Sequence, residues 1–558
     1  NYFLGNDPAK WAGQCRIFQA VTYRNIYPGI DIRYYSDGGR LKYDFIVQPG
    51  ANIARIRMKY EGLTEMAIRN KELLLRTPVG DVIEQAPYSY QFVDGKKAEV
   101  ECRYVLANQT ISFQVKNYDP SQVLVIDPSI IFASFTGSTP DNWGYTATPG
   151  PDGSLYAGGI VFAPPVGTNY PVSPGAYQTV FGGGATEDTF PGYDIAIFKF
   201  SSNGANRMYA TYLGGNANEQ PHSMIVDQQG NLVVAGRSFS QNYPVTTARI
   251  GPGGNYDIVI TKFNAAGSAL LGSVRIGGTG NDGVNIRPKY QGQVGPDGLR
   301  RNYGDDARSE VILDASNNII LASCTQSANF PVRGASFNPG GGFGGGVQDG
   351  VVLKFNSNLS NYIFGSYFGG SGLDACFVAS IDPETGDLYV GGATSSTNLP
   401  GDRTGVLTPN YQGGIADGFV TQIRADGSGL VRTSYFGTTG IDLIYGLKFD
   451  KNGFPYIMGT TTGNWTVTPN VPFSNPGSKQ FISKLRPDLS GYVYSTIFGT
   501  SSAVPNISPI AFLVDRCENV YVSGWGGGIN VTQGYSTGTT NGMAAVNPLP
   551  GLPQPDGQ

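Results

Sequence analysis

Hydrophobic and polar residues alternate in short runs along most of the chain, and turn residues separate the runs. In residues 1–127 such runs include 30–35, 41–47, 98–104 and 110–113. Alternation with a period of two places one side of a strand in a core and the other side in water. The pattern predicts a β-sandwich-like domain over residues 1–127.

After residue 127 the pattern becomes a repeat of four strand signals in fixed order. In one copy the strands are residues 223–227, 231–236, 256–263 and a last run that ends at Gly278. Asp, Asn and Gly residues between them supply the tight turns that antiparallel hairpins need. The last strand recurs at intervals of roughly 60 to 90 residues, which is the mark of a repeat array.

A four-stranded antiparallel unit cannot bury both faces by itself, but radial stacking buries a continuous core. The repeats over residues 128–558 therefore predict a β-propeller of about six four-stranded blades in an all-β chain. The sixth repeat, which ends at Trp525, has no convincing third and fourth strands before Gln558. We expect an incomplete last blade, into which the orphan run 130–137 pairs, with at least one strand, or a whole blade, supplied from beyond Gln558. The alternative is that the ring closes imperfectly.

Composition narrows the class of protein. The chain of 558 residues has 79 Gly, 33 Tyr and 29 Phe, and its net charge is -4. Without a basic cluster, this charge argues against a nucleic-acid partner. No run of 18 apolar residues occurs, so no transmembrane segment is predicted. The opening Asn1-Tyr-Phe-Leu-Gly5 indicates a processed or partial form, with residues missing upstream.

A single histidine, His222, occurs in the chain. Ser-His-Asp triads, Cys-His pairs and multi-histidine metal centres all require imidazole side chains at defined places. One histidine beside a strand is typical of a structural residue. We therefore expect that the chain is not an enzyme.

The five cysteines leave two interpretations open. None forms a Cys-x-x-Cys pair, which argues against a zinc or redox motif. Disulfides Cys15–Cys102 and Cys324–Cys376 would staple the first domain and tie neighbouring repeats, with Cys517 left over. The alternative is that all five are free thiols.

Two series of acidic residues accompany the repeats. Glu219, Asp282, Asp374 and Asp442 each follow the first glycine of a last strand by five positions. Equivalent positions form a ring about a propeller axis, and a carboxylate ring could hold Ca²⁺, the one cofactor that we consider. The alternative is that each caps its own turn. A second series, Asp194, Asp257, Asp349 and Asp417, opens the third strand of each repeat, and we interpret it as structural.

The loops between second and third strands, and an insertion over residues 285–305, are the most variable parts of the array. Variable insertions on one face of an array are where binding usually occurs. These loops carry aromatic residues beside Pro and Gly: Tyr170, Tyr177, Phe181, Tyr243, Phe330, Phe343 and Tyr411. Exposed rings stack on sugar faces, so Tyr170, Tyr177, Tyr243, Phe343 and Tyr411 are candidate ligand-binding residues. The alternative is that the rings pack between blades.

Two segments, Val21-Thr-Tyr-Arg-Asn-Ile-Tyr-Pro-Gly-Ile-Asp-Ile32 and Leu41-Lys-Tyr-Asp-Phe-Ile-Val-Gln-Pro-Gly-Ala51, resemble a bacterial extracellular domain of unknown function. That domain commonly precedes SBBP-type repeats, named for bacterial β-propellers, whose signature is matched by residues 209–215, 227–236 and 257–263. The resemblance covers nearly the whole chain and defines no catalytic residues. It implies a large secreted or surface protein, often of Bacteroidota, with adhesion-type domains and a type IX secretion signal further along.

These observations predict a non-enzymatic, extracellular cell-surface protein whose propeller is a scaffold for binding, adhesion or assembly. Other surface or secreted proteins and glycans are the expected partners. One alternative is a structural subunit of a surface filament or sheath, joined at the unpaired edge of the last blade. The other is a propeller glycosidase or lyase, with two of Asp282, Asp374 and Asp442 placed about 5 to 9.5 Å apart.

Overall fold

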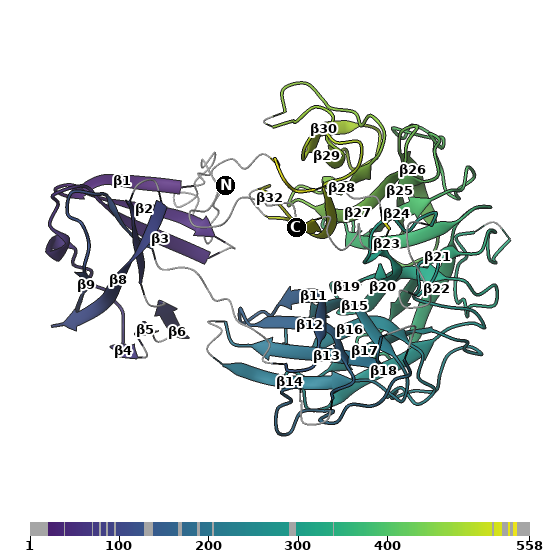
Figure 1. The fold of residues 1–558 in the computed structure, drawn as a ribbon, viewed down its shortest axis with the longest axis horizontal. Coiled ribbons are helices and arrows are strands. Elements are labelled where there is room, and N and C mark those ends of the chain that lie inside the picture. Colours follow the sequence, from purple (N-terminus) through teal and green to yellow (C-terminus); the bar gives the residue numbers. More distant parts are fainter. Residues whose placement is uncertain are drawn as a thin grey trace, which may run out of the picture. The chain divides into compact units, whose positions relative to one another are not determined.

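The computed structural model describes residues 20–543 except 38–39, 70, 78–79, 85–86, 94–95, 128–137, 166–169, 187–189, 203–205, 289–296, 339, 472, 516–517, 527–533 and 536–538. Within these residues the regular structure is β-strand apart from two short 3₁₀ helices, η2 (Ile53–Arg55) and η3 (Asp305–Ala307). The all-β prediction is thus confirmed (Figure 1). The chain forms two compact units, which divide near residue 132. The predicted orphan strand 130–137 lies outside the described residues.

The N-terminal unit consists of two antiparallel sheets that share one hydrophobic core. The larger sheet has the order β1 (Ala20–Tyr27), β2 (Ile30–Asp37), β3 (Arg40–Val47), β10 (Leu124–Asp127), β7 (Tyr88–Val93), β8 (Lys96–Ala107) and β9 (Thr110–Lys116). The smaller sheet has the order β4 (Glu65–Arg69), β5 (Glu72–Thr77) and β6 (Gly80–Glu84). Phe45 and Phe113 of the larger sheet pack in one cluster with Leu73 and Leu75 of the smaller one. The unit is therefore sandwich-like, as predicted.

Within the part of the chain that the structure describes, the second unit has five four-stranded antiparallel sheets and one two-stranded sheet, each in sequence order. The first blade is β11 (Asn142–Pro149), β12 (Leu155–Phe162), β13 (Tyr193–Phe200) and β14 (Arg207–Leu213), and the second is β15 (Glu219–Val226), β16 (Leu232–Ser238), β17 (Asp257–Phe263) and β18 (Leu270–Ile276). The third blade is β19 (Glu310–Leu313), β20 (Ile319–Thr325), β21 (Asp349–Phe355) and β22 (Tyr362–Phe368), and the fourth is β23 (Asp374–Ile381), β24 (Leu388–Thr394), β25 (Asp417–Ile423) and β26 (Leu430–Phe436). The fifth blade is β27 (Asp442–Phe449), β28 (Pro455–Thr461), β29 (Gln480–Leu485) and β30 (Tyr492–Phe498), and the sixth is β31 (Ile507–Val514) and β32 (Val520–Gly526).

The first strand of each blade lies nearest the centre of this unit. Consecutive first strands touch one another in the series β11, β15, β19, β23, β27 and β31, and Figure 1 shows the sheets arranged around a common centre. This is the predicted β-propeller. Among the described residues the sixth blade has two strands, as predicted for an incomplete last blade.

A glycine in the second strand of most blades marks a β-bulge in the first strand. At Gly159, Gly236, Gly392, Gly459 and Gly524 the first strand shifts register, so two of its residues oppose one. The bulge brings a first-strand carbonyl against the glycine: a Cβ on Gly392 would lie 1.9 Å from the Ala375 oxygen. Only glycine leaves room for this approach.

In three blades an ion pair joins the turn between the first and second strands to the third strand. Asp227 accepts hydrogen bonds from the backbone N–H groups of Gln229 and Asn231, which closes the turn. Its second oxygen lies 2.8 Å from Nζ of Lys262 on β17. The same pairing joins Lys354 to Asp314 and Lys484 to Asp450. These lysines are largely buried, so the pairs contribute to blade geometry more than exposed ion pairs would.

Candidate functional site

The insertion that we predicted between repeats is spliced into the innermost strand of the third blade. Asp282 bridges Thr325 of β20, and Glu310 pairs with Ala322, which lies three positions before Thr325 on the same strand. The intervening residues leave and re-enter the strand where the other blades have their bulge. Ser323 stands there in place of the glycine. Because this strand borders the centre of the propeller, the insertion projects into the axial region and does not form a loop on the surface.

Side chains of the insertion contact the innermost strands of distant blades. The ring of Tyr303 packs against Trp143 of β11, with centroids 5.7 Å apart. The Asn302 side-chain amide donates to the Tyr445 hydroxyl on β27 at 2.8 Å. These contacts cross the centre, so the insertion is an axial plug. We use this name for its described residues, 284–288 and 297–308.

A buried ion pair joins the plug to the second blade. The Arg237 guanidinium on β16 donates to the carboxylate and the carbonyl of Asp306, at 2.7 and 2.9 Å, and to Oε1 of Gln220 at 2.6 Å. Arg237 and Asp306 are both fully buried. Burial alone would lower the pKa of Arg237, but the neighbouring Asp306 raises it above its ordinary value. Arg237 therefore keeps its positive charge in the folded propeller.

A second buried carboxylate organises the other side of the plug. Asp305 accepts hydrogen bonds from the backbone N–H groups of Arg301 and Asn302 and from the Tyr445 hydroxyl at 2.8 Å. Arg308 lies 3.1 Å from the other oxygen of Asp305 and donates to the carbonyl of Pro509 on β31 at 2.8 Å. Burial, followed by Asp305, raises the pKa of Tyr445, so this hydroxyl remains a donor. Through these contacts the plug, which belongs to the third blade, binds the fifth and sixth blades.

His222 lies beside this network as a hydrogen-bonding residue. Its Nδ1 is 3.0 Å from the Ser309 hydroxyl, which in turn is 2.8 Å from the Ser323 hydroxyl. All three side chains are buried. This chain of hydrogen bonds joins the second and third blades and fits the structural role that we predicted for the single histidine.

The four acids predicted as a calcium ring are buried turn caps. Glu219, Asp282, Asp374 and Asp442 have no exposed surface. Each accepts from a backbone N–H four residues earlier, at Gly215, Gly278, Gly370 and Thr438. Three of them also accept from a Ser or Thr hydroxyl at the end of the second strand, such as Ser238 and Thr394. The geometry is that of the turn-capping alternative. Among the described residues no three His, Cys, Asp or Glu side chains are grouped as for a metal ion.

The aromatic residues predicted as ligand-binding mostly pack inside the blades. Tyr170 and Tyr243 are 0% and 3% exposed, and their hydroxyls bond to the carbonyl of Ile197 and the hydroxyl of Thr261. The expectation of exposed rings is wrong for these two. The half-buried rings of Tyr177, Phe343 and Tyr411 pack edge-on against Phe263, Tyr367 and Tyr435. Because Pro and Gly let these loops fold back onto the blades, the rings complete the core.

The cysteines that can be placed are free thiols. Cys324 on β20 and Cys376 on β23 are buried side by side, and the Cys376 N–H donates to the Cys324 sulfur. The predicted disulfide between them is not formed. Cys102 is also free, while Cys15 and Cys517 lie outside the described residues.

We expect these thiols to be unreactive in the folded protein. Burial raises the pKa of both Cys324 and Cys102 to about 12, and that of Cys376 further, so little thiolate forms near neutral pH. Iodoacetamide labelling followed by peptide mass spectrometry should modify Cys324 and Cys376 only after denaturation. Rapid labelling of either in the native protein would contradict the burial.

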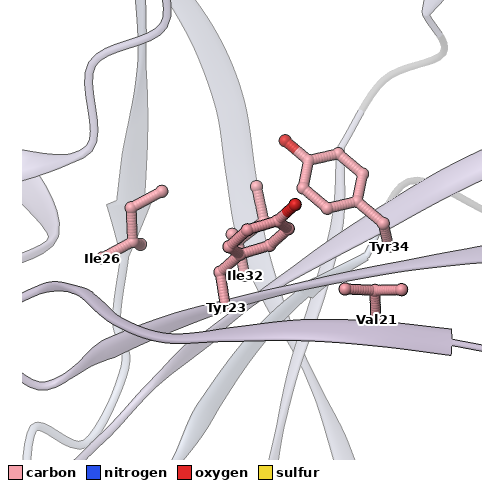
Figure 2. Close-up of a pocket in the computed structure, with 5 residues that line it drawn as sticks. All are labelled: Val21, Tyr23, Ile26, Ile32 and Tyr34. Carbon is pink, nitrogen blue, oxygen red and sulfur yellow. The ribbon is translucent and has the colours of Figure 1, made fainter.

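The N-terminal unit carries an exposed apolar surface that the sequence interpretation missed. This surface lies on β1, the first strand of the larger sheet, and on the neighbouring β2. There Val21, Tyr23 and Ile26 are 43%, 59% and 49% exposed. With Ile32 and Tyr34 of β2 they line a groove of about 490 Å³, shown in Figure 2. Tyr23 packs edge-on against Tyr34, with centroids 6.0 Å apart. The sequence signal for this surface is the apolar content of residues 21–26, and the same pattern would also predict a strand buried in the core.

A comparison with known protein families finds a match in the N-terminal part of the chain. The profile of a domain of unknown function (DUF7948) matches residues 1–129. No curated protein matches the chain. No helix of the described residues is long and apolar enough to cross a membrane.

Several solved structures have low similarity to the chain. A protein of unknown function from Dyadobacter fermentans is 10% identical, with a TM-score of 0.33, and the match covers 70% of this chain and 92% of that one. A mutant NanB sialidase from Streptococcus pneumoniae is 8% identical, with a TM-score of 0.36 and coverage of 89% and 85%. A gluconolactonase from Xanthomonas campestris is 12% identical, with a TM-score of 0.28 and coverage of 66% and 86%. We assign the propeller fold from the sheets of this chain itself. The similarities to solved structures carry no argument about activity.

Proposed function

We propose that this chain is a non-enzymatic, extracellular surface protein that acts as a scaffold for binding or assembly. Its resemblance to SBBP-type repeat proteins supports secretion and a cell-surface location, as in Bacteroidota with type IX secretion. The observation that carries the proposal is the exposed apolar groove on β1 and β2. Surfaces of this kind commonly serve protein contacts.

The groove lies where a partner strand could also add to the sheet. β1 is the end strand in the order of the larger sheet, and six of its eight residues are exposed. An end strand presents unpaired N–H and C=O groups, to which an extended segment of another protein can bind. Its side chains would then fill the apolar groove. We take a protein segment, and not a glycan, as the ligand of this surface, since Val21 and Ile26 offer no hydrogen-bonding groups to a sugar.

The carboxyl pairs considered for a glycosidase are not available to a sugar in this structure. Asp282, Asp374 and Asp442 are fully buried and accept hydrogen bonds from their own turns. This geometry supports the scaffold proposal over that particular catalytic alternative.

Photocrosslinking at Tyr23 is expected to trap a partner protein. The full-length protein would carry p-benzoylphenylalanine at position 23 in the cells that produce it, and adducts would be identified by mass spectrometry. The matched control is the same substitution at Phe239 of the propeller, which is 39% exposed. We expect a discrete heterologous adduct at Tyr23, reduced by the charged substitution Val21→Lys, and none at Phe239.

Other results of the photocrosslinking would count against the binding role. An adduct within the same chain would mean that the groove is covered internally, and no adduct at Tyr23 would remove the proposed joint. An adduct of two copies would favour the alternative of a filament or sheath subunit.

A further inference from the structure

Two carboxyl groups from neighbouring blades face each other at four junctions of the propeller. One belongs to the third strand of a blade and the other to the start of the next blade. Both contact the same glycine: a Cβ on Gly214 would lie 2.5 Å from Asp194 Oδ1 and 2.7 Å from Glu219 Oε2. A Cβ on Gly369 would lie at the same two distances from Asp349 and Asp374. The remaining pairs are Asp257 with Asp282 and Asp417 with Asp442.

Two junctions show how the chain neutralises this position. At the second junction Arg275 places its Nε 2.6 Å from Asp257 Oδ2, so a cation pairs with one of the two acids, while burial raises the pKa of the other, Asp282, to about 7. At the fifth junction amides replace both acids. Gln480 accepts from the backbone N–H of Asn506 at 2.5 Å, and its Nε2 faces Asn506 Oδ1 at 3.4 Å. The amide pair also flanks the equivalent glycine, Gly499. An N–H therefore stands between the two side-chain oxygens.

Among the described residues, both positions of the first, third and fourth junctions are acids and no arginine pairs with them, although the Asn338 amide donates to Asp349 Oδ2 at 3.3 Å in the third. Asp194, Asp349 and Asp417 are fully buried, and one oxygen of each lacks a hydrogen-bond partner. Two ionised carboxylates that contact the same glycine repel each other strongly. A buried acceptor without a donor also lowers the stability of the folded state. A proton on one carboxyl removes both penalties, in the same way as the N–H of Gln480 does. We propose that each of these three junctions binds one proton, shared between its two carboxyl groups, in the folded propeller.

The surroundings of the pairs supply few cations. Tyr212 and Tyr243 face the first pair, Tyr367, Tyr435 and Cys376 face the third, and Tyr411, Tyr435, Tyr492 and Lys479 face the fourth. Burial and then Glu219 raise the pKa of Asp194 to about 9. Burial raises the pKa of Asp349 and of Asp417 to about 7, against their local hydrogen bonds. Lys479 opposes the shift at Asp442, so the fourth junction holds its proton least firmly.

The bound protons make the folded state more stable in acid than in base. Unfolded Asp and Glu titrate near pH 4, and the folded pairs titrate higher. Stability is therefore fully present below about pH 4 for these groups and is lost as the pH rises toward their folded pKa values. Across that window the unfolding equilibrium constant rises up to tenfold per pH unit for each proton that only the folded state binds.

Proton release on unfolding tests the proposal directly. The full-length protein is unfolded by urea at pH 6 in weak buffer, and released protons are counted with a pH indicator. Asp194→Asn and Asp349→Asn should each reduce the release by about one proton relative to the wild type. The control is Asp426→Asn: hydrogen bonds from Ser428 lower the pKa of this exposed carboxyl, so it is ionised at pH 6 in both states and the count should not change. The converse double substitution, Gln480→Glu with Asn506→Asp, should add a proton.

Infrared spectroscopy of the wild type keeps the test independent of how the variants fold. The native protein at pH 6 should show the C=O band of protonated carboxyl groups, and this band should disappear on unfolding. Absence of the band in the native protein, or an unchanged proton count in Asp194→Asn, would overturn the proposal. Release of Ca²⁺ in place of protons, measured with a calcium indicator, would overturn it as well.

Discussion

Replacing Arg237 with alanine is expected to lower the free energy of unfolding of the propeller by about 3 to 5 kcal/mol. The substitution leaves the carboxylate of Asp306 fully buried without the cation 2.7 Å away, and it removes the hydrogen bond to Gln220. It also breaks the buried ion pair between the second blade and the axial plug. Urea denaturation of the full-length protein, followed by tryptophan fluorescence and calorimetry, measures the loss.

Three variants separate the effect of the ion pair from a general effect of losing an arginine. Arg486→Ala removes an exposed arginine of the fifth blade and should change stability by less than about 0.5 kcal/mol. Arg237→Met combined with Asp306→Leu removes both charges and should recover much of the loss. Arg237→Lys should not, because one ammonium cannot reproduce the forked contacts. Equal stability of Arg237→Ala and Arg486→Ala would contradict the role of the plug.

The blades could be predicted from the sequence because their determinants are local. Alternating residues, a turn aspartate such as Asp227 and a glycine such as Gly236 lie within one hairpin, and each acts on neighbours a few positions away. Repetition then adds information, because every copy reports the same geometry. The acids at the blade junctions were visible for the same reason, although their pairing was not.

The contacts between blades could not be predicted, because they join residues far apart in the chain. Asp305 meets Tyr445 across 140 positions, and no local pattern in either segment signals this contact. Residues 285–305 read as a variable surface loop, since insertions usually lie on the surface. The decisive fact was that this insertion interrupts an innermost strand, and the strand's place becomes apparent only when the blades are assembled. Tyr170 and Tyr243 were misjudged for a similar reason, because their loops fold back onto the blades.

The bulge glycines lead to a second large expected effect, in Gly392→Ala. Strand β24 passes so close to the bulge of β23 that the new Cβ would meet the Ala375 carbonyl oxygen at 1.9 Å. The neighbour is backbone within a paired sheet, so relief requires the two strands to separate. We expect a loss of about 3 kcal/mol, at the upper end of ordinary overpacking costs. Thermal and urea unfolding of the full-length protein measure it.

Gly429→Ala in the same blade is the matched control for the bulge. A Cβ on Gly429 has open space around it, and its backbone needs no left-handed conformation, so stability should change by less than about 0.5 kcal/mol. The third blade provides a natural comparison, since Ser323 occupies the bulge position where the axial plug replaces the single extra residue. Gly392→Ala as stable as Gly429→Ala would mean that the first strand can yield at the bulge. The glycine pattern would then not be a requirement of blade packing, and a bulge position could accept a side chain without a plug.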